Sequence, residues 1–191
     1  MIRTINYFKN NRTLYFAIGF TLAFFLYITL VLGHISSCFT LEVGANSLGL
    51  SLYYTKDMVQ NFFEARTQEQ LLCYSQFLAI WDAIFAFIYT LMYVSWIRYF
   101  FKSKSLFLII PILAMITDWT ENYIELLMLE TYLNSIPISE TLVSLGSGIN
   151  SFKWTLSSLT YLLIFFGIII ILKTFLTNLI FRKKTTIKKF N

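Results

Sequence analysis

Residues 105–129 read SLFLIIPILAMITDWTENYIELLML, an apolar run that contains Asp118, Glu121 and Glu125. Three other apolar stretches accompany it, at residues 14–33, 77–97 and 154–172, and the one charged residue among them is Asp82. Each stretch is long enough to cross a hydrocarbon core of about 30 Å as a helix, which needs about 20 residues. The sequence therefore predicts an all-α integral membrane protein in which residues 1–191 form a single four-helix bundle.

Composition supports a membrane protein. The chain is 57% hydrophobic and only 13% charged, whereas a soluble domain carries about a quarter charged residues. Arg3, Lys9 and Arg12 precede the first apolar stretch, as in a signal peptide. That stretch is longer than the h-region of a signal peptide, and no A-x-A-like cleavage site follows it. We therefore expect a retained anchor.

Basic residues predict the orientation of the bundle. Twelve of the 15 Lys and Arg residues lie before the first stretch, between the second and third, or after the fourth, with no acidic residue among them. The positive-inside rule then places both termini in the cytoplasm of a bacterial cell, with the bundle in the inner membrane. The predicted cytoplasmic basic surface, which includes the tail 173–191, comprises Arg98, Lys102, Lys104, Arg182, Lys183, Lys184, Lys188 and Lys189. This surface either only sets topology and contacts anionic lipids, or also binds RNA or a cytosolic partner.

The connection between the first two stretches is predicted to be mostly helical. Thr55 can cap a short helix whose apolar residues, among them Phe62 and Phe63, share one face. Thr67 and Gln70 form a Thr-x-x-Gln capping box, so the second spanning helix is expected to begin outside the membrane. Cys38 and Cys73 flank this connection. They either form a disulfide in an oxidising periplasm or remain two buried thiols.

Polar residues from all four helices are predicted to converge in the outer half of the bundle as a buried polar cluster. Its members are His34, Asp82, Asp118, Glu121, Asn122, Glu125 and Lys153. Those on the third helix are spaced by three, four and seven residues and so share one face. Carboxylates facing lipid are costly, which favours turning them inward. We expect Lys153 to open the fourth helix and Pro111 to kink the third.

Several members of the cluster have a purely structural interpretation. Asp82 and Lys153 are predicted to form a buried ion pair that fixes helix register. Glu125 can reach the outer interface, and His34 is expected to be an interfacial residue rather than a ligand. Asp118 and Glu121 are the candidate catalytic residues, and together with His34 they would either bind a cation or lipid headgroup, or perform acid/base chemistry on a lipid. One His and two Cys do not make a zinc site, and we predict no metal and no cofactor.

The run Asp118-Trp-Thr-Glu121-Asn122, together with Asp82 and Lys153-Trp154, resembles small bacterial four-span membrane proteins with a D-x-x-E-N motif. The size, four-span layout and Phe/Ile/Lys/Asn-rich composition also resemble the four-span membrane accessory proteins of type VI-B CRISPR loci, encoded beside an RNA-guided RNase. This second resemblance implies a non-enzymatic regulator of that RNase in antiviral defence.

Three functions from different classes follow. The first is a regulatory or accessory protein that contacts a cytosolic protein or ribonucleoprotein through its basic surface. The second is an intramembrane lipid-modifying enzyme that uses the outer carboxylates. The third is a channel or transporter subunit that forms a homo-oligomer around the acidic face.

Overall fold

The computed structural model of the chain describes residues 11–42, 47–101 and 105–187. All regular secondary structure within these ranges is helical. The elements in chain order are α2 (Asn11–Leu26), η1 (Tyr27–Leu32), α3 (Gly33–Ile35), η2 (Ser36–Cys38), η3 (Leu48–Leu50), α4 (Lys56–Glu64), α5 (Gln68–Gln76), η4 (Phe77–Asp82), α6 (Ala83–Phe101), η5 (Ser105–Leu108), α7 (Ile109–Leu133) and α8 (Glu140–Ile187). Of the η segments, η1 and η4 are π-helical and the others are short 3₁₀ turns.

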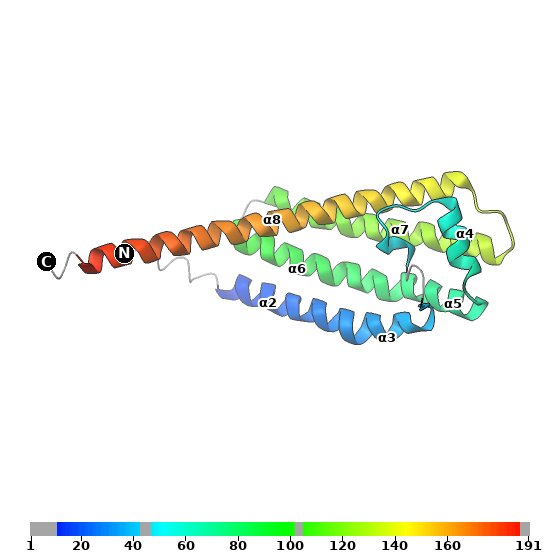
Figure 1. The fold of residues 1–191 in the computed structure, drawn as a ribbon, viewed down its shortest axis with the longest axis horizontal. Coiled ribbons are helices and arrows are strands. Elements are labelled where there is room, and N and C mark those ends of the chain that lie inside the picture. Colours follow the sequence, from blue (N-terminus) through cyan, green and yellow to red (C-terminus); the bar gives the residue numbers. More distant parts are fainter. Residues whose placement is uncertain (1–10, 43–46, 102–104, 188–191) are drawn as a thin grey trace.

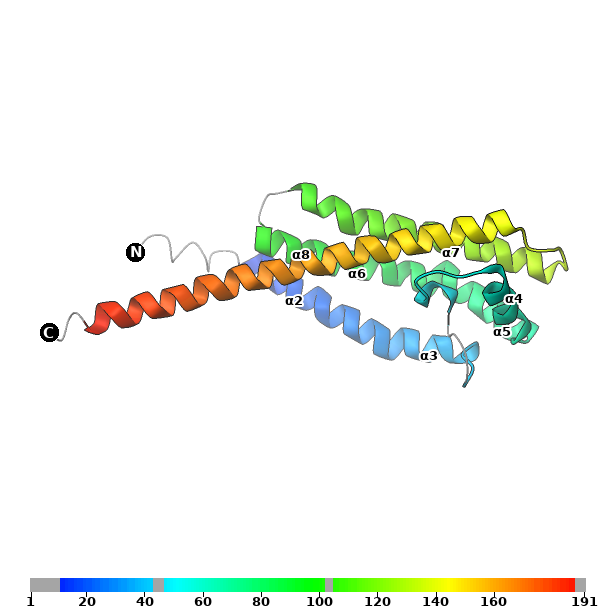
Figure 2. The ribbon, with the colours of Figure 1, turned by 45° about the horizontal axis from the view of Figure 1, so that its top comes forward.

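The long helices form an elongated bundle (Figure 1). α7 packs against α8 and α2 packs against α6, while α6 also contacts α7 and α8. The start of α2, the end of α6 and the start of α7 lie at one end of the bundle, where α8 extends beyond the other helices (Figures 1 and 2). α4 and α5 lie at the opposite end, which we call the capped end.

Three of the described helical segments are long and apolar enough to cross a membrane. They are Arg12–Cys38, Gln68–Phe101 and Glu140–Asn178. Only 6% of the apolar window of the first segment is buried inside the protein, compared with 39% for the second. A soluble protein rarely exposes so continuous an apolar surface. α7 has sufficient length but carries Asp118, Glu121 and Glu125 on the face that it buries.

The predicted caps of the outer helices are confirmed. The Thr55 side chain accepts a hydrogen bond from the backbone N of Met58 at the start of α4. Thr67 and Gln70 form the reciprocal capping box at the start of α5. The second segment of membrane-spanning length does begin before the apolar run, because α5 continues through η4 into α6 without a break.

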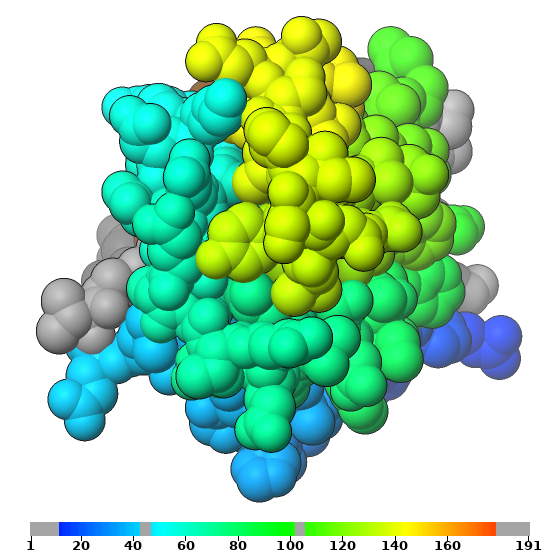
Figure 3. All heavy atoms as spheres, turned by 90° about the vertical axis from the view of Figure 1, so that its right-hand side faces the viewer, coloured from blue at the N-terminus to red at the C-terminus, as the bar shows by residue number. Residues whose placement is uncertain are grey.

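The capped end is held together by buried side chains. Arg66 donates to the carbonyl of Phe39 (2.9 Å) and to that of Phe62 (2.7 Å), and its guanidinium lies over the Phe62 ring. A disulfide joins Cys38 to Cys73, with their Cα atoms 6.4 Å apart. The larger hydrophobic cluster of the protein also lies here, while a smaller one around Tyr89 and Tyr93 lies further along α6. Figure 3 shows α4, α5 and the segment that joins α7 to α8 covering this end.

Two predictions about the helices are wrong. α8 begins at Glu140 rather than near Lys153, because the Ser- and Gly-rich residues 144–151 continue the helix where it packs on α7 and on the segment before α4. The predicted span 154–172 therefore lies inside a much longer helix. Pro111 is the third residue of α7, where a missing N–H costs no helical hydrogen bond, so it starts the helix rather than kinks it.

Candidate functional site

α7 presents one acidic face to the interior of the protein. Asp118, Glu121, Asn122 and Glu125 are all at most 5% exposed. Their spacing places them on one face of the helix, as predicted. This face is buried within a single copy of the chain. The described residues therefore do not favour a channel that several copies would form around it. Glu125 is completely buried, and the expectation that it reaches the outer interface is wrong.

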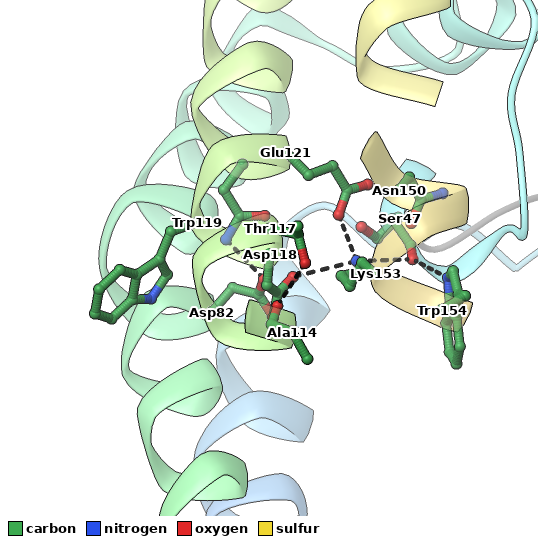
Figure 4. A network of polar contacts seen from close by, with 12 residues as sticks. Ser47, Asp82, Ala114, Thr117, Asp118, Trp119, Glu121, Asn150, Lys153 and Trp154 are labelled. Atoms are coloured by element: carbon green, nitrogen blue, oxygen red, sulfur yellow. Dashed lines mark hydrogen bonds and ion pairs between the residues drawn. The ribbon is translucent and has the colours of Figure 1, made fainter. Parts of the chain in front are cut away.

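Lys153 is the cation that faces this acidic side of α7. It lies almost four turns into α8, and its Nζ is 3.2 Å from Asp118 Oδ1. The same Nζ donates to Glu121 Oε2 and to the carbonyl of Gly49, at 3.3 Å for the latter. Figure 4 shows Lys153 between Asp118 and Glu121. All of its donor capacity is thus used within the protein.

Glu125 lies one helical turn beyond Glu121 on the acidic face and has a different partner. The Tyr74 hydroxyl donates to Glu125 Oε2 and also contacts Ser47 Oγ, at 3.1 Å. Glu121 Oε2 and Glu125 Oε2 thus each have a donor, whereas no described residue donates to the Oε1 atom of either side chain.

Asp82 has a different environment from the other carboxylates. Asn122 Nδ2 donates to Asp82 Oδ2 (2.8 Å), and the described residues place no cation within 4.0 Å of it. The predicted ion pair between Asp82 and Lys153 is therefore wrong, because Lys153 turns toward α7. Asp82 is only partly buried and lines the pocket described below.

The segment before α4 lies along α8 and is fastened to it by side chains. Asn150 Nδ2 donates to the carbonyl of Ser51 (2.6 Å), and Ser151 Oγ donates to that of Leu52 (2.9 Å). Trp154 Nε1 donates to the Gly49 carbonyl that also accepts from Lys153, at 3.1 Å. A Cβ at Gly49 would stand 3.0 Å from Glu121 Oε1, so a glycine permits this close approach.

A pocket of about 470 Å³ opens beside the polar network, a volume within the usual range for small-ligand sites. α2 and η1 supply one wall through Phe24, Ile28 and Leu32, and α8 supplies the other through Ser157 and Tyr161. Asp82, Asp118, Asn122 and Lys153 line its polar part. In both views α2 and α8 diverge toward the capped end (Figures 1 and 2). We call this cavity the lateral pocket.

Two irregular helical turns border the lateral pocket. η1 contributes Ile28 and Leu32, and η4 contributes Phe77 and Asp82. Wide π turns are uncommon and occur often at functional sites. Backbone carbonyls in and next to η4 accept side-chain hydrogen bonds, for example that of Trp81 from Tyr27 (2.9 Å) and that of Ala83 from Trp119 (3.0 Å). These contacts hold the wide turn and so position Asp82.

Aromatic rings form a continuous wall of the lateral pocket. Successive ring centroids lie 5.4 Å apart for Phe24 and Phe85, 5.5 Å for Phe85 and Tyr89, 5.4 Å for Tyr89 and Tyr93, and 5.3 Å for Tyr93 and Tyr161. All five line the pocket. We call this row the aromatic ladder. It joins the polar part through Tyr89, whose hydroxyl donates to Asp118 Oδ2 (2.9 Å).

The remaining predicted site residues lie elsewhere. His34 is exposed at the end of α3 and does not line the lateral pocket, so it is not part of the cluster. Arg98 is exposed near the end of α6, and Arg182, Lys183 and Lys184 lie within α8. Lys102, Lys104, Lys188 and Lys189 lie outside the described residues.

The structure adds site residues that sequence reasoning missed. Tyr74 and Tyr89 donate to carboxylates of α7, and Tyr54 is buried with its hydroxyl near Gly146. Burial raises the pKa of Tyr54, and the nearby Glu125 and Glu121 raise it further, so this hydroxyl keeps its proton. The sequence does carry a signal for Tyr89. Aromatic residues recur at positions 85, 89 and 93, on one face of the helix that follows Asp82.

Comparison of the chain with protein-family models, with curated proteins and with solved structures finds no match.

Proposed function

We propose that this chain is a four-span protein of the bacterial inner membrane whose lateral pocket binds one amphiphile. The observation that carries the proposal is the pocket itself, which has apolar walls from α2 and α8 and a charged part formed by Asp82, Asp118 and Lys153. Such a cavity matches a molecule with an apolar chain and a polar head. The fourth span in this proposal is α7, whose acidic residues are covered by the other helices.

Entry from the side fits the arrangement of the helices. α2 packs on α6, and α8 packs on α7 and α6, so α2 and α8 stand as separate walls. The outward faces of both helices expose large apolar residues, among them Leu22 and Phe165. In a membrane these faces would contact lipid. A chain from the bilayer could then pass between the walls while the capped end stays covered.

Binding of a labelled amphiphile to the purified protein tests the proposal. A tritiated dodecyl probe is expected to bind saturably to the protein in uncharged detergent, with about one probe per chain. Ser157→Trp fills the pocket and should abolish this binding. Ser158→Trp is the matched control, because Ser158 is the next residue of α8 and is exposed. Equal binding by both variants, or no saturable binding to the unmodified protein, would refute the proposal.

A second proposal concerns the end of the bundle opposite the cap. α8 extends well beyond the other helices there and carries Arg182, Lys183 and Lys184 (Figure 1). A basic helix of this kind suits anionic lipid, RNA or an acidic protein surface. We propose that it contacts a cytosolic partner, and the resemblance to type VI-B accessory proteins makes an RNA-guided RNase the partner to test.

The two proposals can be distinguished by experiment. Removal of residues 179–191 should change RNase activity in cells that carry a type VI-B CRISPR system, and should leave amphiphile binding intact. A gene neighbourhood that contains a CRISPR array would support regulation. Unchanged RNase activity in the truncated and full chains, combined with a neighbourhood of envelope-biosynthesis genes, would instead favour lipid chemistry at Asp82 and Asp118.

A further inference from the structure

We infer that the lateral pocket selects an amphiphile with a cationic ammonium head, with Asp82 as its counterion. The inference rests on the proposed function, since it names the headgroup that the same pocket would take. It follows from three features of the described residues. These are the excess of carboxylates in the polar part of the pocket, the lack of an ion-pair partner for Asp82 and the aromatic ladder.

The polar part of the pocket has more carboxylates than cations. Among the described residues, Asp82 and Asp118 both line it, and Lys153 is the one cation that does. Lys153 is already engaged by Asp118, Glu121 and the Gly49 carbonyl. An anionic head would meet two carboxylates and a lysine with no donor to spare. A cationic head would reduce this excess of negative charge, which favours it in a site of low dielectric.

Asp82 is placed to receive such a head. Its Oδ2 accepts from Asn122, while the described residues provide no ion-pair partner. Carboxylates are seldom left partly buried without a cation or several donors. The described residues contain no group of three or more His, Cys, Asp or Glu that could hold a metal ion. The volume of the pocket and its largely apolar walls also suit an organic cation with a chain better than a bare ion.

The aromatic ladder supplies the second half of an ammonium site. Phe85 and Tyr89 line the pocket together with Asp82, which lies at most two turns away on the same continuous helix. Aromatic faces attract ammonium groups through the ring quadrupole, and aromatic cages recognise quaternary ammonium ligands. A hydroxyl head could donate a hydrogen bond to the carboxylate, but it would neither balance its charge nor gain the cation–π attraction of the rings. The combination therefore distinguishes ammonium from hydroxyl and sulfate heads.

Three dodecyl probes that differ only in the head test this inference on the full-length protein in uncharged detergent. Competition against the tritiated probe should rank dodecyltrimethylammonium at least about tenfold tighter than dodecanol and dodecyl sulfate, because only the ammonium head gains both charge attraction to Asp82 and cation–π attraction to the rings. Asp82→Asn keeps the shape of the side chain and should reduce this preference to about twofold or less. Glu69→Gln, which changes an exposed carboxylate of α5, should leave the preference unchanged.

The outcomes separate the inference from the proposed function. Equal affinity of the unmodified protein for all three probes would overturn the ammonium assignment and leave amphiphile binding intact. Absence of binding by every probe would overturn both. An ammonium preference that survives in Asp82→Asn with an unchanged melting temperature would overturn the role of Asp82. Because the ranking is measured on the unmodified chain, the inference stays testable even where a variant fails to fold.

Discussion

Lys153 forms ion pairs with two carboxylates that are almost completely buried. Lys153→Met would leave Asp118 and Glu121 without their cation, and removing one partner of a buried pair costs about 3–5 kcal/mol. We expect a loss of that order in the free energy of unfolding, measured in detergent by tryptophan fluorescence. Lys173→Met is the control, because Lys173 is exposed on the same helix.

Combined replacement of the charges gives a second check on the role of Lys153. Lys153→Met together with Asp118→Asn and Glu121→Gln removes the stranded charges and should recover much of the lost stability. If Lys153→Met and Lys173→Met unfold alike, the ion pairs contribute nothing and the role given to Lys153 is wrong.

At the residue scale, sequence reasoning found the acidic face of α7 but not its partners. A period of 3.6 residues is enough to place Asp118, Glu121 and Glu125 on one side of a helix. Which side of α8 faces them depends on how that helix is rotated, and around Lys153 small, polar and apolar residues are mixed on every side of α8. η4 adds a further difficulty, because a wide turn rotates all later residues about the helix axis. The direction of Tyr89 relative to Tyr74 therefore differs from that in a regular α-helix.

At the scale of single elements, the close contact of α7 with α8 depends on Gly146. A Cβ there would stand 2.9 Å from Ile124 Cγ2 and closer still to the Tyr54 hydroxyl. Gly146→Ala is therefore expected to lower the free energy of unfolding by about 1–3 kcal/mol through overpacking. Gly148→Ala is the matched control on the same helix. A Cβ placed at Gly148 would have no atom within 4 Å apart from its chain neighbours and the nearby backbone of its own helix.

The two glycine variants should differ in sign. Alanine stabilises an exposed helical position by about 0.5–1 kcal/mol relative to glycine, so Gly148→Ala should raise the melting temperature while Gly146→Ala lowers it. Equal shifts in the same direction would show that α7 and α8 do not approach each other as described.

The disulfide links the end of the membrane-length segment Arg12–Cys38 to α5. Cys38 and Cys73 are 35 residues apart in sequence. A disulfide that closes a loop of this length stabilises the folded protein by about 2–4 kcal/mol. Cys38→Ser and Cys73→Ser should lower the free energy of unfolding equally and abolish the faster band on a non-reducing gel. Complete alkylation of both thiols without a reductant would contradict the bridge.

Element boundaries were predicted well where side chains cap them and poorly where apolar runs defined them. Thr55 and Thr67 carry local signals that work through the next turn of helix alone. The start of α8 has weaker signals, Pro137 and Ser139 before Glu140, and its first turns are polar. They are helical because α7 and the segment before α4 pack on them, which a hydropathy window does not register.

At the scale of the whole molecule, charge and architecture make one topology testable. The ends of α6 and α8 and the start of α2 share one end of the bundle, and α4 and α5 occupy the other. With the basic residues at the first of these ends, reporter fusions after Lys104 and after Phe190 should be cytoplasmic, and a fusion at Gly44 periplasmic. A periplasmic C-terminus would contradict the proposed orientation and, with it, the expectation that the disulfide lies in the periplasm.

Photo-crosslinking with a dodecyl probe that carries a diazirine on its chain tests most directly whether the lateral pocket holds an amphiphile. After illumination and mass spectrometry, adducts should concentrate on residues that line the pocket from both walls, such as Ile28, Leu32 and Ser157. The adducts should disappear in Ser157→Trp and persist in Ser158→Trp. Adducts spread over outward-facing residues such as Phe16 and Phe165, with no difference between the two variants, would contradict binding in the pocket.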